Sequence, residues 1–188
     1  MARLSREFYT GDTVEIARAL LGKYLVRRLP DGTVLAGRLA ETEAYIGRCD
    51  KACHAYNYRR TARTETLFAA PGTAYIYLIY GMYHCPNFVT EAEGEPAAVL
   101  IRGIQPRHNF DIIAENRFHC KWDQLTRPRL AHICDGPGKL CRALALTRAQ
   151  NGLSLLGDEL YVCSSLDHLS LPPWPGDNQL FRIQAGKR

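Results

Sequence analysis

The stretch Glu41-Thr42-Glu43-Ala44-Tyr45 ends a predicted β-strand that begins at Thr33. Side chains alternate between the two faces of a strand, so Glu41, Glu43 and Tyr45 share one face. Burying unpaired carboxylates costs several kcal/mol, roughly, so this face cannot be an ordinary core face. Two interpretations stay open: a solvated sheet edge with a salt bridge to a nearby arginine, or a half-desolvated cleft in which a carboxylate acts as a general base.

Further segments have the composition of β-strands and are separated by turn residues. They are Tyr24 to Leu29, Thr73 to Tyr83, Ala97 to Ile104 and Glu159 to Cys163. The turn residues Pro30-Asp31-Gly32 join the first of these to the strand that ends at Tyr45, which predicts a hairpin. Helices are predicted from Asp12 to Gly22, in part of the segment from Arg107 to Arg129, and from Pro137 to Leu146.

The segment from Thr73 to Tyr83 is rich in tyrosine. Aromatic residues favour strands, and alternation places Tyr75 and Tyr77 on one face. Tyr80 precedes Gly81, which predicts a turn at a hairpin tip and therefore an exposed Tyr80 ring. A large exposed ring usually contacts another molecule, whereas aromatic packing across the sheet is enough to account for Tyr75.

Charge and composition are those of one globular domain without a membrane span. Lys and Arg number 24 against 19 Asp and Glu, and this net charge of +5 favours polyanionic partners only weakly. No apolar run approaches the roughly 20 residues that cross a bilayer, and the N-terminus lacks a secretory signal. The cysteines are odd in number and irregularly spaced, so reduced thiols are expected. We expect a cytoplasmic or nucleoid-associated protein, or a nuclear one in a eukaryote.

Basic and aromatic residues are interleaved in the irregular segment 46–71, which includes Tyr56, Tyr58, Arg59, Arg60 and Arg63. This mixture suits contacts with a phosphate backbone and exposed bases, but it also describes an ordinary solvated loop. Lys139 is a second candidate for phosphate binding, together with the free amides where Pro137 opens a helix. The segment is not a P-loop, because a glycine and a hydroxyl of that motif are missing.

Three groups of side chains compete for a chemical role. The first combines a carboxylate base, aromatic walls and a cation, and consists of Glu43, Tyr45, His54, Tyr77 and Arg102. The second is a metal site from Cys49, Cys53 and His54, which would imply a zinc-dependent nucleic-acid-binding protein but has no second ligand pair downstream. The third is a glycosidase that uses the Glu41 and Glu43 carboxylates, about 6.5 Å apart at the backbone.

Arg102 is the single charged residue in the otherwise apolar strand from Ala97 to Ile104. A guanidinium in such a strand needs an anionic partner, either a carboxylate or a phosphate. Glu43 is the candidate partner within this chain.

The order of several motifs resembles that of the alkyladenine (3-methyladenine) DNA glycosylases, the monofunctional kind without a helix-hairpin-helix motif. Each motif alone is weak, but the ordered set is specific and runs from Leu4 to Cys163. The matching stretches are Ala17-Arg18-Ala19-Leu20-Leu21-Gly22, Glu41-Thr42-Glu43-Ala44-Tyr45, residues 50–54, Pro71-Gly72-Thr73, Tyr75-Ile76-Tyr77, Tyr80-Gly81-Met82, Cys85 with Asn87, Val99-Leu100-Ile101-Arg102, and Gly136-Pro137-Gly138-Lys139-Leu140-Cys141.

The resemblance implies a role for each matching residue. Glu43 is the implied general base that deprotonates water, and Arg102 helps to hold that water. The implied pocket for an extruded base consists of Tyr45, His54, Tyr77 and Asn87, and Asn87 crowds the 2-amino group of normal guanine. Tyr80 fills the gap left in the duplex. Candidates for contact with the DNA backbone are Arg59, Arg60, Arg63, Met82, Tyr83 and Lys139.

The resemblance also implies a fold and a reaction. We expect a mixed α/β (α+β) fold, a single domain over residues 1–188 with a curved, largely antiparallel β-sheet, flanking helices and a protruding β-hairpin. The expected partner is double-stranded DNA with damaged purines, bound by a monomer. The expected reaction hydrolyses the N-glycosidic bond of alkylated purines, with deaminated purines as further candidates, and leaves an abasic site. No cofactor or metal is implied, and no lysine in the motifs suits a strand-nicking Schiff base.

Departures from the family lie beside the pocket and at the C-terminus. Leu67 stands where Met is common, and Pro86 precedes Asn87 and restricts the backbone there. Family members continue past an Arg-Ile-Gly-type segment, whereas Phe181-Arg182-Ile183 is followed by Gln184. We therefore expect a shortened C-terminal part. An alternative function stays open, that of a lesion-recognising DNA-binding protein with weak or no hydrolase activity.

Overall fold

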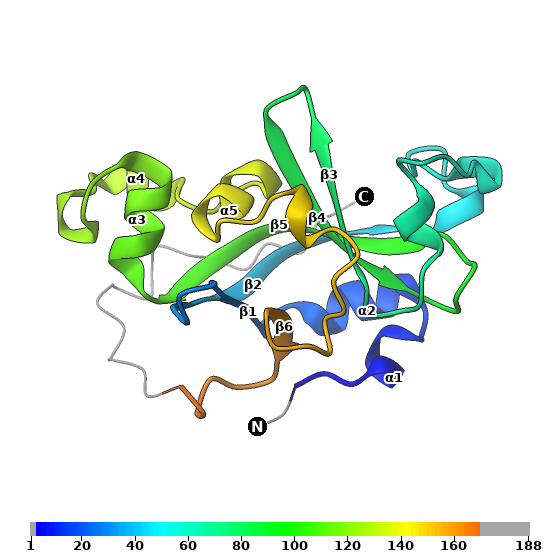
Figure 1. Cartoon of the computed structure of the whole chain (residues 1–188), viewed down its shortest axis with the longest axis horizontal. Coiled ribbons are helices and arrows are strands. Elements are labelled where there is room, and N and C mark those ends of the chain that lie inside the picture. Colours follow the sequence, from blue (N-terminus) through cyan, green and yellow to red (C-terminus); the bar gives the residue numbers. More distant parts are fainter. Residues whose placement is uncertain (1–2, 170–188) are drawn as a thin grey trace.

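The computed structural model describes residues 3–169, in which one antiparallel sheet has the strand order β3-β4-β5-β2-β1-β6. Its strands are β1 (Tyr24–Arg28), β2 (Val34–Tyr45), β3 (Ala74–Ile79), β4 (Tyr83–Thr90), β5 (Ala97–His108) and β6 (Leu160–Cys163). Figure 1 shows that the sheet is curved and that the hairpin of β3 and β4 projects beyond it. The predicted mixed α/β fold with a curved antiparallel sheet and a protruding hairpin is confirmed.

Short helices flank the sheet. The α-helices are α1 (Arg6–Tyr9), α2 (Thr13–Leu20), α3 (Phe110–Phe118), α4 (Arg127–Ala131) and α5 (Pro137–Ala143), and the 3₁₀ turns are η1 (Gly47–Cys49), η2 (Tyr56–Tyr58), η3 (Glu65–Phe68), η4 (Trp122–Gln124) and η5 (Arg148–Gln150). Helix α5 packs against β4 and β5, and α2 packs against β2 and β5. In Figure 1 these two helices lie on opposite sides of the sheet. None of the helices within residues 3–169 combines the length and apolarity needed to cross a bilayer.

The helix boundaries follow from local chemistry. The Asp12 side chain accepts hydrogen bonds of 3.0 Å from the N–H groups of Val14 and Glu15, so it caps α2 as expected. Helix α5 ends at Ala143, earlier than the predicted end at Leu146. The cause is the left-handed backbone of Ala145, with φ of +51°, which a continuing helix cannot include.

Strand β2 pairs with β5 over most of its length, and register shifts interrupt the pairing on either side of Glu41. Such bulges bend a strand and redirect its side chains. The Thr42 hydroxyl donates a hydrogen bond of 2.9 Å to the carbonyl of Ala17 in α2. Thr42 therefore faces α2, and its neighbours Glu41 and Glu43 face away from that helix.

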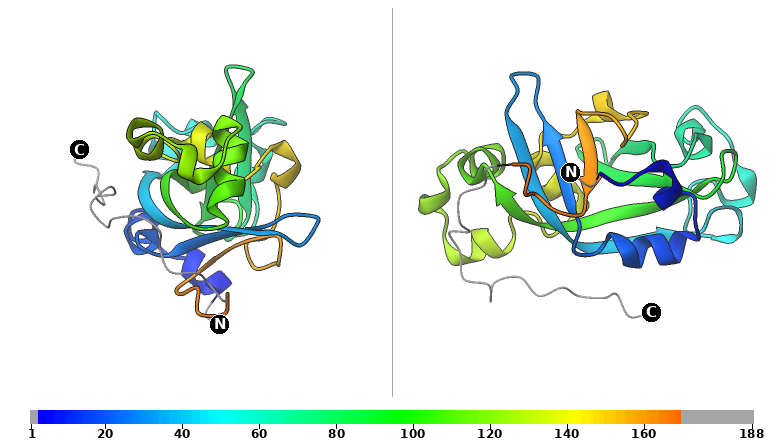
Figure 2. Two further views of the ribbon diagram at one scale, coloured as in Figure 1. Left: turned by 90° about the vertical axis from the view of Figure 1, so that its left-hand side faces the viewer. Right: turned by 90° about the horizontal axis from the view of Figure 1, so that it is seen from below.

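The hairpin of β3 and β4 turns at Tyr80 and Gly81. Both residues have positive φ, +53° and +69°, and the Met82 N–H donates to the Ile79 carbonyl at 3.2 Å. This is the geometry of a type I′ turn, whose twist matches that of paired strands. The left-hand view of Figure 2 shows that the tip of the hairpin stands clear of the helices.

A second, smaller hydrophobic cluster joins the irregular segment 47–68 to the sheet. It is separate from the main core and contains Cys53, Ala55, Leu67, Phe68, Tyr75, Val89 and Ala98. Tyr45 and Tyr77 are partly buried against it. This cluster holds a segment with little regular structure in a defined place over β3 and β4, because burial of these side chains stabilises the contact.

Candidate active site

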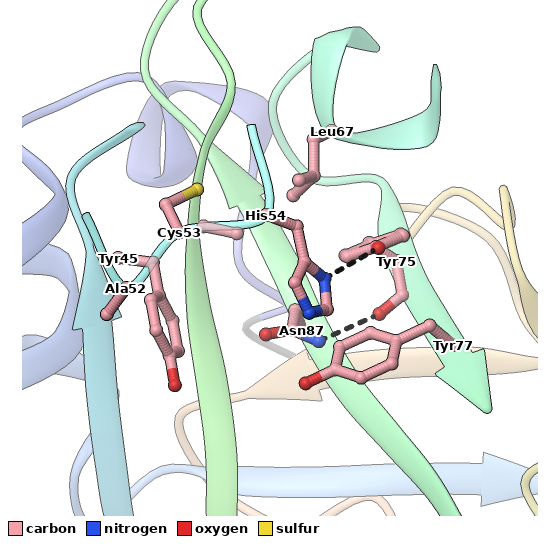
Figure 3. A pocket seen from close by; sticks show the side chains of 9 residues that line it. Tyr45, Ala52, Cys53, His54, Leu67, Tyr75, Tyr77 and Asn87 are labelled. Atoms are coloured by element: carbon pink, nitrogen blue, oxygen red, sulfur yellow. Dashed lines mark hydrogen bonds between the residues drawn. The ribbon is translucent and has the colours of Figure 1, made fainter. Parts of the chain in front are cut away.

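A small, partly open cavity of about 30 Å³ lies between the irregular segment 47–68 and the sheet. Its lining residues are Tyr45, Ala52, Cys53, His54, Leu67, Tyr75, Tyr77, Asn87 and Ala98. Figure 3 shows the rings of Tyr45 and Tyr77 on opposite sides of the cavity, with His54 and Asn87 between them. The structure therefore brings together the four side chains that the sequence predicted for a pocket.

The aromatic wall of the cavity is a contiguous set of rings. The His54 ring meets the edge of Tyr77 with a centroid distance of 4.6 Å, and the Tyr75 and Tyr77 centroids are 5.3 Å apart. The Arg63 guanidinium carbon lies 5.3 Å from the Tyr77 centroid, within the range of a cation–π contact. Tyr75 was not among the predicted pocket residues, although its alternation with Tyr77 placed both on the same face.

Hydrogen bonds fix the polar groups of the cavity. The buried Asn87 donates from Nδ2 to the carbonyls of Tyr75 and Cys85, both at 3.2 Å. Nδ1 of His54 lies 3.2 Å from the Tyr75 hydroxyl oxygen. Because both N–H groups of Asn87 are used, its side-chain oxygen is the atom that is available to a ligand.

Burial keeps the titratable groups of the cavity uncharged at neutral pH. It lowers the pKa of His54, and the positive charge of Arg63 acts in the same direction. It raises the pKa of Tyr75 to about 12 and raises the pKa of Tyr77 well above its usual value. A neutral, aromatic cavity of this kind suits a planar heterocycle.

Two carboxylates and one guanidinium lie next to the cavity on the same face of the sheet. Arg102 donates from Nη1 to Oε2 of Glu43 at 2.8 Å and from Nε to Oε1 of Glu41 at 3.0 Å. Glu43 does not line the cavity, but Tyr45, two positions along β2, does. Burial raises the pKa of Tyr45, and the adjacent Glu43 carboxylate raises it further. The predicted ion pair between Arg102 and Glu43 is confirmed. A salt bridge with an arginine and a cleft, which the sequence offered as alternatives for this strand face, therefore occur side by side.

The hairpin tip carries the most exposed large apolar side chains. Among residues 3–169, Tyr80 is 82% exposed, followed by Met82 at 66% and Tyr83 at 49%. The expectation of an exposed Tyr80 at a tip is confirmed. Just below the turn, a side chain on Gly138 of α5 would place its Cβ 2.9 Å from the Tyr83 ring, so only glycine allows this close packing.

The candidates for DNA-backbone contact lie at several places on the surface. Arg60 forms two hydrogen bonds with the Glu65 carboxylate, at 2.9 and 2.6 Å. Lys139 donates to Asp135 at 2.8 Å. Arg59 is exposed. A phosphate would have to compete with these carboxylates for Arg60 and Lys139.

The cysteines of the proposed metal group point to different partners. The thiol of Cys49 donates to the Ile46 carbonyl, and that of Cys53 donates to the Pro96 carbonyl. Within residues 3–169, no group of three or more His, Cys, Asp or Glu side chains is arranged to hold a metal ion. The geometry of these residues gives no support to a zinc-dependent protein.

Comparison with known proteins assigns the chain to a family. The sequence model described as methylpurine-DNA glycosylase (MPG) matches residues 7–180. The chain belongs to the methylpurine-DNA glycosylase family. It is a DNA glycosylase that acts on alkylated bases in base-excision repair.

Bacterial relatives agree with this assignment. A protein of Desulfitobacterium hafniense is 45% identical over 172 residues, covering 91% of this chain and 84% of its own length. One from Clostridium perfringens (strain 13 / Type A) is 47% identical over 161 residues, covering 85% and 78%. Both carry the name "Putative 3-methyladenine DNA glycosylase". The predicted C-terminal segment Phe181-Arg182-Ile183 lies outside the described residues.

Proposed function

We propose that the cavity receives a damaged purine rotated out of double-stranded DNA and that Glu43 activates the water that hydrolyses its N-glycosidic bond. The observation that carries this proposal is the position of the Glu43 carboxylate. It is bonded to Arg102 and lies on the same strand face as Tyr45, at the edge of an aromatic cavity.

The cavity walls account for recognition of an alkylated base. A base within a duplex cannot reach an enclosed site, so the nucleotide has to rotate out of the stack. Tyr45 lines one side of the cavity, and the contacting rings of His54 and Tyr77 line the other (Figure 3), so a purine ring would lie between these aromatic walls. N-alkylation makes a purine cationic, and each tyrosine face then attracts it by about 0.5–2 kcal/mol. Asn87 lines the same cavity and would crowd a purine that carries a 2-amino group.

The hairpin tip supplies a wedge. Rotating a nucleotide out of a duplex costs a few kcal/mol, roughly, and an inserted side chain offsets part of that cost. Tyr80 is exposed on a turn that is closed by the hydrogen bond from the Met82 N–H to the Ile79 carbonyl. Met82 and Tyr83 follow it closely in the chain and are also exposed, and they would contact the adjacent DNA backbone. A monomer presents all of these parts on one chain.

The reaction follows from the charges at the edge of the cavity. Glu43 accepts a proton from water, and the resulting hydroxide attacks the anomeric carbon of the sugar as its bond to the purine nitrogen breaks. The bonding electrons stay with the purine, which neutralises the positive charge of an alkylated base. The carboxylate stabilises the positive charge that develops on the sugar, and Arg102 keeps it in position. Deaminated purines such as hypoxanthine are a second substrate class, since neutral rings also stack between tyrosines.

The test compares two carboxylates that share one arginine. Glu43→Gln is expected to abolish release of 3-methyladenine from duplex DNA while binding of the lesion-containing duplex persists. Glu41→Gln removes the other partner of Arg102 and serves as the matched control, with a smaller loss expected. Full activity of Glu43→Gln would overturn the proposal. Formation of abasic sites by the unaltered chain distinguishes hydrolysis from lesion recognition alone.

A further inference from the structure

We propose that Arg48, Tyr58 and Glu95 form a clasp that holds one wall of the cavity in place, and that these three are positioning residues for the reaction. The wall is segment 47–58, which contributes His54 and the two residues before it to the lining of the cavity. The inference deepens the proposed function and rests on it only for the effect on base release.

Segment 47–58 is attached to the rest of the protein through its side chains. Within residues 3–169, its backbone–backbone hydrogen bonds are local, such as the one from the Cys53 N–H to the Asp50 carbonyl at 3.0 Å. Isolated turns of this kind open at a low cost in free energy unless other contacts hold them. The position of His54 against the Tyr77 ring, 4.6 Å away between centroids, therefore depends on side-chain contacts of the segment.

The Tyr58 hydroxyl joins a cation of the segment to an anion outside it. The hydroxyl oxygen accepts a hydrogen bond of 2.6 Å from Nη1 of Arg48. The hydroxyl hydrogen is donated to the Glu95 carboxylate, whose two oxygens lie 3.0 and 3.2 Å away. The Arg48 guanidinium carbon also lies 5.4 Å from the centroid of the Tyr58 ring, within the range of a cation–π contact. Both hydrogen bonds have a charged member, which makes them stronger than neutral ones.

Glu95 lies on a loop that is itself held in place. This loop connects β4 to β5, and hydrogen bonds tie it to two other parts of the chain. The Gly94 N–H donates to the Phe68 carbonyl at 3.1 Å, and the Glu91 N–H donates to the carbonyl of the buried Tyr9 at 3.0 Å. The clasp therefore fastens a segment with local backbone bonds to a loop with long-range ones.

The backbone of Tyr58 indicates that its side chain has a role beyond the turn. Asn57 and Tyr58 have φ of +54° and +56°, and the Arg59 N–H donates to the Tyr56 carbonyl at 3.2 Å. Two central residues with positive φ are typical of a type I′ turn, in which glycine is preferred at the second of them. Tyrosine there is strained relative to glycine. The clasp accounts for this residue, because glycine would suit the turn but could not reach Arg48 and Glu95.

Hydrogen exchange of the full chain, measured by mass spectrometry on peptides from segment 47–58, tests the clasp without reference to activity. Tyr58→Phe keeps the ring but removes the hydroxyl, and it should raise the exchange rate of the segment about tenfold, since hydrogen bonds to charged groups are lost. Glu95→Ala should have the same effect, whereas Glu95→Gln keeps an acceptor oxygen and should exchange more slowly than Glu95→Ala. Unchanged exchange in Tyr58→Phe would overturn the proposal.

Two further variants and a control separate the clasp from a general loosening of the fold. If Tyr58 and Glu95 act through one hydrogen bond, the double variant Tyr58→Phe with Glu95→Ala should exchange no faster than either single variant. Tyr58→Gly relieves the strained turn but removes the clasp, so the segment should exchange faster although the melting temperature does not fall. Additive effects, or slow exchange in Tyr58→Gly, would overturn the proposal. Glu15→Ala breaks the exposed ion pair with Arg18 in α2 and should leave the exchange of the segment unchanged.

Excision assays supply the second readout. Tyr58→Phe should lower the maximal single-turnover rate of 3-methyladenine release about tenfold, because a loosened wall places His54 less accurately. Its affinity for undamaged duplex DNA should change less than this rate. Faster exchange of the segment with an unchanged release rate would overturn the positioning role. If the unaltered protein releases no base at all, the proposed function fails, while hydrogen exchange still decides whether the clasp holds the segment.

Discussion

Arg102 in β5 donates a hydrogen bond from Nη1 to Oε2 of Glu43 in β2, across 2.8 Å. The same guanidinium donates from Nε to Glu41, so one cation orients two carboxylates that lie on the same strand face. The Arg102 side chain is 40% exposed and that of Glu43 is 29% exposed. The ion pair is thus partly solvated, and its main effect is to set the direction of the Glu43 carboxylate.

Arg102→Gln should therefore reduce activity far more than stability. Partly exposed ion pairs contribute about 1 kcal/mol or less, so the free energy of unfolding measured in urea should change little. Loss of a group that orients charge at the reacting centre should lower the single-turnover excision rate by about 100-fold. Arg102→Lys keeps the charge but cannot bond both carboxylates in the same geometry, so its excision rate should lie between those of the unaltered protein and Arg102→Gln. An excision rate unchanged in Arg102→Gln would contradict this role.

Tyr80→Gly should stabilise the protein while weakening its action on duplex DNA. Tyr80 has φ of +53°, a conformation that favours glycine by about 1 kcal/mol over other residues. Its ring is exposed, so removing it costs little packing. The melting temperature should rise, and excision from a lesion-containing duplex should fall because the wedge is missing. Tyr80→Phe is the control and should retain excision; equal activity of the glycine variant would exclude a wedge.

Asn87→Ala should relax discrimination against bases that carry a 2-amino group. The substitution enlarges the cavity where Asn87 crowds such a group, so the ratio of 7-methylguanine to 3-methyladenine release should rise. It also leaves the buried carbonyls of Tyr75 and Cys85 without their donor, at a cost of about 1–3 kcal/mol. Competition assays on the two lesions below the melting transition would test this, and a falling ratio would contradict it.

His54 and His108 should make the protein less stable in mild acid. Burial lowers the pKa of both residues in the folded protein. As pH falls below 6.5, the unfolded chain therefore binds more protons than the folded one, and the free energy of unfolding decreases until the folded pKa is passed. Unfolding in urea at pH 7.5 and 5.5 should show this loss, and His54→Gln should reduce it. If the free energy of unfolding of His54→Gln depended on pH as that of the unaltered chain does, His54 would not contribute to the loss.

Local features of the structure could be predicted from short stretches of sequence. Asp12 caps α2 and the Tyr80-Gly81 pair turns the β3–β4 hairpin, because capping and turn geometry depend on a few neighbouring residues. Alternation likewise indicated that Glu41 and Glu43 share a face. The early end of α5, before Ala145, could not be predicted in this way, since left-handed alanine has no sequence signature.

The contacts between distant segments were decided by the tertiary structure. From the sequence, packing across the sheet was enough to account for Tyr75. The structure shows that His54 contacts it, and this contact could not be predicted because 21 positions separate the two residues. The sequence made Lys139 a candidate for phosphate binding. In the structure, the turn that opens α5 brings the Lys139 ammonium to the Asp135 carboxylate, which is its partner.

The sequence by itself determined the family, the positions of most strands along the chain and the residue types of the candidate site, since these depend on local pattern and motif order. The tertiary structure decided which side chains meet: Arg102 with both carboxylates, and Tyr45 opposite Tyr77 around a cavity. The physical reason is distance along the chain. Arg102 and Glu43 are 59 positions apart, and only the register between β2 and β5, with its bulges beside Glu41, brings them within hydrogen-bonding range.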